Sequence, residues 1–252
     1  MIKGLKKLAL IGMLTVAGGI YNNGRTSENS SNTTENYHEK LANYLEKQSE
    51  LYIASNLEKK VREEREFFIE SIKKPLYINP DLLNNYIKQA QKAVGKLPKE
   101  IDKRLFKIML KQESQYDAHA ISKTGYMGIG QNGLDVYKTF RLKQWESFRD
   151  STTGEIDTLS VKKEIFDPAI NLGLSIQYLN YISNFCKKND KDWENKDLEE
   201  QRKEILACYN AGHGTIQKVN WDLKSKKLKE ENRNYPKVIL AAYHNPNIKV
   251  KL

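Results

Sequence analysis

Apolar side chains from residue 80 onward recur every three or four positions, and this helical periodicity is the feature that most restricts the fold. Together with capping and proline signals, it predicts helices that begin at Asp81, Pro98 and Asp167, a short helix over 204–209 and a last helix over 235–243. Alternating runs of useful strand length are missing outside one glycine-rich loop region. We therefore expect a mainly α domain.

The chain before this domain changes composition twice. Three lysines precede the short apolar run Leu8–Ile20, which is typical of an export signal or an N-terminal membrane anchor, with a buried helix as the alternative. A tract rich in Ser, Asn, Thr and Glu follows, and then a Glu/Lys-rich stretch with an apolar helical face. We expect a signal peptide or anchor at 1–23, a flexible linker at 24–36, a helical arm at 37–79 and the main domain at 80–252.

The charge balance favours an anionic partner. Lys and Arg number 42 against 32 Asp and Glu, a net charge of +10 that suits nucleic acid, an acidic membrane face or a cell-wall polymer, or reflects a codon bias toward Lys. The sequence has no arginine-rich block and no Cys/His cluster, so we expect no nucleic-acid binding and no metal. Cys186 and Cys208 are then either buried thiols, which we favour, or a disulfide.

Glu113 is the strongest candidate for chemistry. Leu105, Met109 and Glu113 lie four residues apart, so the carboxyl group shares the stripe that should face the core. Burial removes water from a carboxyl group and raises its pKa, which suits a general acid near neutral pH. The alternative is an ion pair with a lysine at the end of a helix.

The segment from Glu113 to Gln131 resembles, without a gap, the main motif of the soluble lytic transglycosylase family, which is related to goose-type lysozymes. That motif reads Glu-Ser, an aromatic residue, a small residue and Ser, then Gly-Ala-x-Gly-Leu-Met-Gln. Here Glu113-Ser114 is followed by Tyr116 and the glycine-rich loop 125–133. Three more segments are similar to family motifs. The first is 167–173 together with Tyr178-Leu179, in which the glycine stands at a different position from that of the family; the others are 207–212, and 231–235 together with Val238.

This resemblance implies a lysozyme-like helical domain, with a glycine-rich loop region and an N-terminal helical arm, that binds peptidoglycan glycan strands without a cofactor. It implies cleavage between N-acetylmuramic acid and N-acetylglucosamine with formation of a 1,6-anhydro product, in an exported protein of the periplasm or cell envelope. Glu113 falls on the catalytic acid. The substrate-binding positions fall on Ser114, Gln131, Tyr209, Asn210, Glu231 and Tyr235.

Departures from the pattern keep two alternatives open. Gly130 stands where the family has Met, Tyr126 replaces a small Ala, and Asn132-Gly133 replaces an apolar pair. One alternative is a goose-type lysozyme that uses the same acid to deliver water. The other is a weakly active or non-catalytic wall-binding component of a secretion or conjugation machine, and Gly130 is the feature that favours it.

Overall fold

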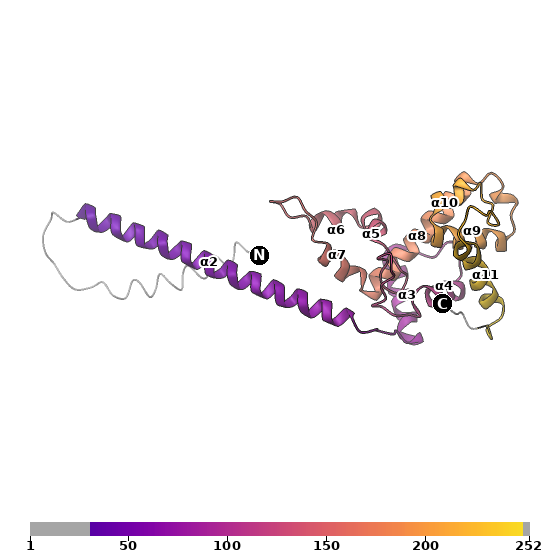
Figure 1. The fold of residues 1–252 in the computed structure, drawn as a ribbon, viewed down its shortest axis with the longest axis horizontal. Helices are drawn as coiled ribbons and strands as arrows, with labels where there is room; N and C mark the ends of the chain where they lie inside the picture. The colour runs from indigo at the N-terminus through magenta and orange to yellow at the C-terminus, as the bar shows by residue number, and fades with distance from the viewer. Residues whose placement is uncertain (1–30, 249–252) are drawn as a thin grey trace. The chain divides into compact units, whose positions relative to one another are not determined.

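The computed structural model describes residues 31–248 (Figure 1). The predicted signal or anchor at 1–23 therefore lies outside the described residues. The chain forms two units, residues 1–62 and residues 63–252. Between residues 31 and 248 the regular structure is helical, and the only β-type pairings there are isolated bridges between loop residues. The mainly α prediction is confirmed.

The helices differ in length from a single turn to a long rod. Their bounds are α2 Ser31–Ile72, α3 Pro80–Val94, α4 Lys103–Ser114, α5 Leu134–Phe140, α6 Leu142–Ser147, α7 Thr158–Ile165, α8 Pro168–Asn189, the 3₁₀ turn η1 Trp193–Asn195, α9 Leu198–Ala211, α10 His213–Lys218 and α11 Glu230–His244. In this part of the chain, no helix is both long enough and apolar enough to cross a bilayer.

Side-chain caps decide where the helices begin, and two predicted starts were wrong. Asn79 caps α3 instead of Asp81, because Pro80 takes the first helical position and places the cap one residue before it. Asp102 caps α4 by accepting from the Leu105 amide, so the helix begins after the turn that Pro98 opens. The Asp167 cap of α8 is confirmed.

The segment 132–166, for which no helix was predicted, contains α5, α6 and α7. Each is eight residues or shorter, so none shows enough turns for a periodic pattern. The helix expected over 204–209 begins earlier, at Leu198, behind a capping box formed by Asp197 and Glu200. The last helix begins at Glu230 and carries Pro236 in its second turn.

Helix α8 lies between two apolar clusters of the second unit (Figure 1). Leu172, Ile176 and Leu179 face a larger cluster built with α3, α4, α9 and α11. Leu174 faces a smaller cluster with side chains from α5 and α7, and Tyr178 packs against both clusters. Residues on opposite sides of α8 are therefore fixed by two separate cores.

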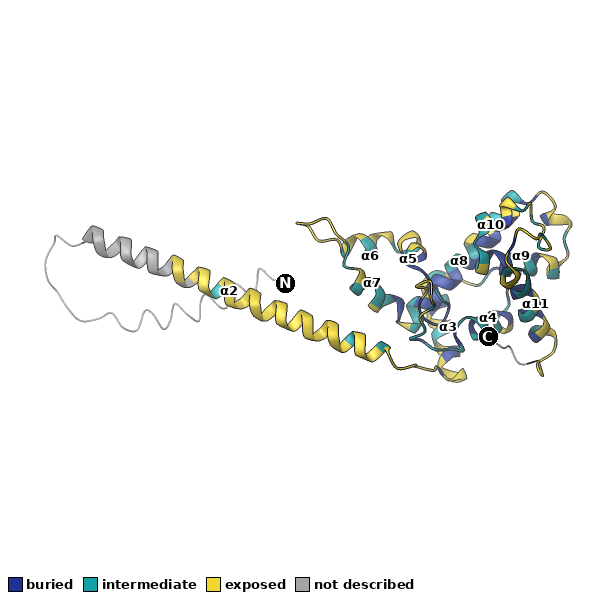
Figure 2. Cartoon of the chain, in the orientation of Figure 1, coloured by how far each residue is buried: buried dark blue, intermediate teal, exposed yellow. Residues whose placement is uncertain are grey.

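The predicted arm is a helix whose two ends behave differently. Helix α2 already begins at Ser31, so residues 31–36, assigned to the linker, are helical, in keeping with the preference of Ser, Asn and Thr for helix starts. Figure 2 shows its described side chains to be almost all exposed up to Arg62. The predicted apolar face is only partly used: Phe68 and Ile72 pack against the smaller cluster. Three other residues of that face are exposed to solvent, namely Ile53, Leu57 and Val61.

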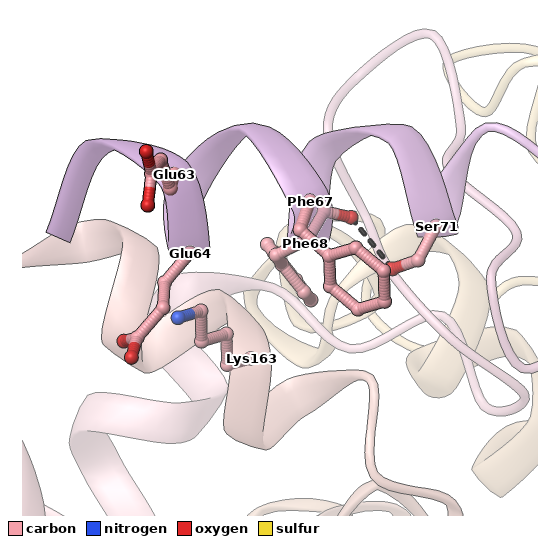
Figure 3. A pocket seen from close by; sticks show the side chains of 6 residues that line it. All are labelled: Glu63, Glu64, Phe67, Phe68, Ser71 and Lys163. Atoms are coloured by element: carbon pink, nitrogen blue, oxygen red, sulfur yellow. Dashed lines mark hydrogen bonds between the residues drawn. The ribbon is translucent and has the colours of Figure 1, made fainter. Parts of the chain in front are cut away.

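The end of α2, from Glu63 onward, belongs to the second unit and borders a hollow of about 490 Å³ (Figure 3). Phe68 is held there by an aromatic contact with Phe166 at 6.0 Å between ring centroids and by Lys163 Nζ, 5.6 Å from its ring. The adjacent Phe67 is 77% exposed. The hollow shares no residue with the segment around Glu113.

We predict that Phe68→Ala lowers the free energy of unfolding of the second unit by about 1–3 kcal/mol, because it removes a half-buried ring from the smaller cluster. The matched variant Phe67→Ala, one position away on the same helix, should change it by less than about 0.5 kcal/mol. Urea unfolding followed by circular dichroism measures both. Equal effects of the two substitutions would contradict the packing described for the end of α2.

Candidate active site

Glu113 occupies the last turn of α4, with its predicted apolar neighbours in place. Leu105 and Met109 are fully buried on the same side of the helix, which confirms the predicted stripe. The helix ends immediately afterwards, because Gln115 adopts a left-handed conformation with φ of 57° and donates its amide to the Lys111 carbonyl oxygen. Glu113 is thus the stripe's outermost member and is partly buried.

Loss of water is the main reason that the pKa of Glu113 is raised from 4.5 to about 7. The Tyr235 hydroxyl donates a hydrogen bond to Glu113 Oε1 and lowers the pKa in part, because it favours the charged form. Among the described residues, no second carboxyl group contributes to this shift. Glu113 therefore holds a proton at near-neutral pH without sharing it with a neighbouring acid.

Two tyrosines from the C-terminal half interact with this carboxyl group, Tyr235 through a hydrogen bond and Tyr209 through electrostatics. Tyr235, on the buried face of α11, is its hydrogen-bond donor. Tyr209, near the end of α9, donates to the Gly130 carbonyl oxygen at 2.7 Å. Burial raises the pKa of both phenols, and the charge of Glu113 raises both further, so both hydroxyl groups lie within its electrostatic reach. Packing of α11 against α4 and α9 brings these residues together.

The glycine-rich loop is tied to α8 through the side chain of Asn171. Its amide Nδ2 donates to the carbonyl oxygens of Met127 and Ile165, both at 2.9 Å, while its Oδ1 accepts from the Gly130 amide at 2.7 Å. Gly128 has φ of +76°, and a Cβ there would lie 2.4 Å from Asn171 Nδ2, so only glycine fits. The loop backbone is thereby held against α8.

Ser114 and Gln131, two of the predicted substrate-binding residues, use their side chains to shape the loop. The buried Ser114 hydroxyl donates to the Ile129 carbonyl oxygen at 2.8 Å. The amide of Gln131 donates to the carbonyl oxygens of Gly128 at 2.9 Å and Ala120 at 3.3 Å. These contacts give both residues a part in holding the geometry of the loop.

The other predicted binding residues are distributed unevenly around the acid. Tyr209 and Tyr235 lie in its immediate surroundings, as described above. Asn210 and Glu231 are exposed, and Glu231 forms an ion pair with Lys229 at 3.8 Å in the first turn of α11. The structure therefore brings Tyr209 and Tyr235 to Glu113 and places Asn210 and Glu231 at the surface.

Glu204 shows that a raised pKa alone does not identify the acid. Burial also raises its pKa to about 7, against the lowering effect of Lys196. However, Glu204 is 3% exposed, and the Lys196 ammonium group forms ion pairs with both Glu204 and Asp190. A carboxyl group enclosed in this way has no access to a polymeric substrate, whereas Glu113 is only partly buried.

Sequence reasoning missed the buried polar residues that connect the loop to α8, namely Asn132, Asn171 and Ser175. Asn171 was part of a motif, but no local pattern shows that its partners lie about forty residues earlier in the chain. The cysteines were placed correctly: Cys186 on α8 and Cys208 on α9 are buried free thiols, 3.8 Å apart between sulfur atoms. No group of three His, Cys, Asp or Glu side chains within residues 31–248 could hold a metal ion.

Comparison with known proteins gives one family. A family model described as the transglycosylase SLT domain matches residues 86–234, which is more than half of the chain. The matched span runs from α3 into α11 and contains Glu113, Gln131 and Tyr209, and it ends one residue before Tyr235. No curated protein matches the chain significantly.

Proposed function

We propose that this chain, which belongs to the transglycosylase SLT domain family, cleaves the β-1,4 bond between N-acetylmuramic acid and N-acetylglucosamine and leaves a 1,6-anhydro-muramic product. The family comprises lytic transglycosylases that act on peptidoglycan, and the helical fold is its lysozyme-like domain. The observation that carries the finer proposal is Glu113, a partly buried carboxyl group that keeps its proton up to about pH 7.

In the first step, protonated Glu113 would donate its proton to the glycosidic oxygen. Proton transfer is efficient when the pKa of the acid lies near the working pH, and dehydration brings the pKa of Glu113 there. As the bond to the leaving sugar breaks, positive charge develops at C1 of the muramic acid residue. The acetamido oxygen of that sugar can stabilise this charge, so the protein need not supply a second carboxylate.

In the second step, the Glu113 carboxylate would take the proton from the C6 hydroxyl of the same sugar, whose oxygen then attacks C1 and closes the anhydro ring. The proton given in the first step is thus recovered, and no water is consumed. Retaining glycosidases need two carboxyl groups about 5–5.5 Å apart. The pKa of Glu113 shows no influence of a second acid, which supports single-acid chemistry.

The Tyr235 hydroxyl suits both steps. It donates to Glu113 Oε1 and therefore stabilises the carboxylate that forms when the proton leaves. Because it fixes one carboxyl oxygen, the other is the one that we expect to exchange the proton with the substrate. Tyr235, which the family resemblance placed among the substrate-binding residues, would thus act on the acid itself.

We predict that Glu113→Gln lowers the rate of peptidoglycan digestion at least 10²–10⁴-fold, roughly the contribution of one positioned acid. The amide keeps the shape of the side chain but cannot transfer the proton, and the same group serves as the base. The measurement is turbidity loss of purified sacculi, with mass spectrometry of the released muropeptides. Anhydro products lack the mass of one water molecule relative to reducing-end products.

Asp117→Asn is the matched control, four residues further along the chain. Asp117 Oδ1 accepts from the Leu76 and His119 amides at 2.8 and 2.9 Å, and an asparagine oxygen can accept both bonds. Its activity should stay close to that of the unaltered protein. Substantial activity in Glu113→Gln would reject the assigned acid, and reducing-end products alone would identify a goose-type hydrolase.

We also propose that the protein is exported to the cell envelope, where its substrate lies. The support is the lysine-rich start followed by the apolar run Leu8–Ile20. Residues 1–36 fused to a reporter that is active only outside the cytoplasm should give signal. A control fusion carrying Leu10→Arg and Leu14→Arg, which interrupts the run, should not. A silent reporter from the unaltered leader, at normal expression, would refute export.

A further inference from the structure

The backbone of Gly130 is fixed from both sides. Its amide donates to Asn171 Oδ1 at 2.7 Å, and its carbonyl oxygen accepts from the Tyr209 hydroxyl at 2.7 Å. The residue is buried. Because α8 holds one end of this peptide and α9 the other, the loop cannot shift at this point without loss of a hydrogen bond beside Glu113.

The hydroxyl of Ser175 occupies the space in which a side chain at position 130 would begin. A Cβ on Gly130 would lie 2.0 Å from Ser175 Oγ, far inside any contact that real side chains make. Ser175 is fully buried. Its Oγ accepts from Asn132 Nδ2 at 2.9 Å and donates to the Asn171 carbonyl oxygen at 3.1 Å. If the hydroxyl turned away, it would lose both hydrogen bonds and would itself be left as a fully buried polar group without these partners.

The same hydroxyl reaches the candidate active site through Tyr209. The Tyr209 hydroxyl lies 3.2 Å from Ser175 Oγ as well as within hydrogen-bond distance of Gly130. Ser175 thus contacts the phenol that holds the Gly130 carbonyl oxygen, one residue after Ile129, whose carbonyl oxygen accepts from Ser114, the neighbour of Glu113 in the chain. Its influence on the acid would be exerted through Tyr209.

The two positions share one volume. Because Gly130 has no side chain, the Ser175 hydroxyl can occupy this space, where it forms hydrogen bonds with Asn132 and Tyr209 that a glycine at position 175 could not make.

We propose that Ser175 is a positioning residue: its hydroxyl takes the place of a side chain at Gly130 and holds Tyr209 beside Glu113. This inference rests on the proposed function for its effect on turnover, but the coupling between the two positions is a property of packing alone. Gly130 and Ser175 then form a compensated pair, in which the missing side chain at position 130 makes room for the hydroxyl at position 175.

The coupling is tested by a double-mutant cycle in thermal unfolding. Gly130→Ala alone should lower the unfolding midpoint by about 5 °C or more, because its Cβ displaces Ser175 Oγ. In the Ser175→Gly background the same substitution should lower it much less, because the closest atom to the Cβ is then Asn132 Nδ2, at 3.2 Å. Gly173→Ala is the matched control on α8, since a Cβ there makes only an ordinary contact, 3.6 Å from Val94. Equal effects of Gly130→Ala in both backgrounds would show that positions 130 and 175 are not coupled, and would overturn the inference.

The positioning role is tested by kinetics on solubilised glycan strands, well below the unfolding midpoint. Ser175→Ala should lower kcat about tenfold with a smaller change in KM, because a displaced Tyr209 disturbs the acid more than substrate binding. In the Tyr209→Phe background, Ser175→Ala should have almost no further effect on kcat. If Ser175 has only a structural role, Ser175→Ala should lower the unfolding midpoint but leave kcat unchanged, and its effect should be the same with or without Tyr209→Phe. That result would overturn the positioning role.

The thermal cycle and the kinetic measurements together distinguish a failure of this inference from a failure of the proposed function. If the unaltered protein leaves glycan strands intact, the proposed function fails and the positioning role fails with it. The thermal cycle would still decide whether Gly130 and Ser175 are a compensated pair. If the unaltered protein is active and the thermal cycle is additive, the inference fails alone.

Discussion

The dehydrated carboxyl group of Glu113 is the constraint on which the rest of the site depends. Burial at the end of the α4 stripe raises its pKa to about 7, and the Tyr235 hydrogen bond limits the rise. Because this pKa is raised above the ordinary 4.5, the proton contributes stability that is complete below about pH 4.5 and is lost as the pH rises through 7. The difference corresponds to roughly 3 kcal/mol. The fold thus gives up stability at neutral pH to keep a usable acid.

Holding that carboxyl group in place requires four elements that meet from distant parts of the sequence. Helix α4 supplies Glu113, α11 supplies Tyr235, and α9 supplies Tyr209. Helix α8 supplies no atom to the acid, yet it anchors the glycine-rich loop through Asn171 and separates the two apolar clusters. The contrast with Glu204, whose pKa is similar but which is enclosed with Lys196, shows that position decides which acid can act.

Local patterns predicted the parts of the molecule that depend on neighbours in sequence. The four-residue spacing placed Glu113 on the stripe of Leu105 and Met109, and the Asp167 cap of α8 was read correctly. Local patterns could not predict contacts between residues about forty positions apart, such as Asn132 and Ser175, because the periodicity of a single helix carries no information about them. Helices α5–α7 were missed because one or two turns carry too little periodicity. The apolar face predicted for the arm is used for packing only near the end of α2.

The most direct test of this account is the pKa of Glu113, measured by titration of its side-chain carboxyl ¹³C resonance, assigned by its absence in Glu113→Gln. The account predicts a midpoint near pH 7 in the unaltered protein. It predicts a higher midpoint in Tyr235→Phe, because that variant loses the hydrogen bond that favours the carboxylate. A midpoint near 4.5 would show a hydrated carboxylate with no proton to donate at neutral pH, and would contradict the account.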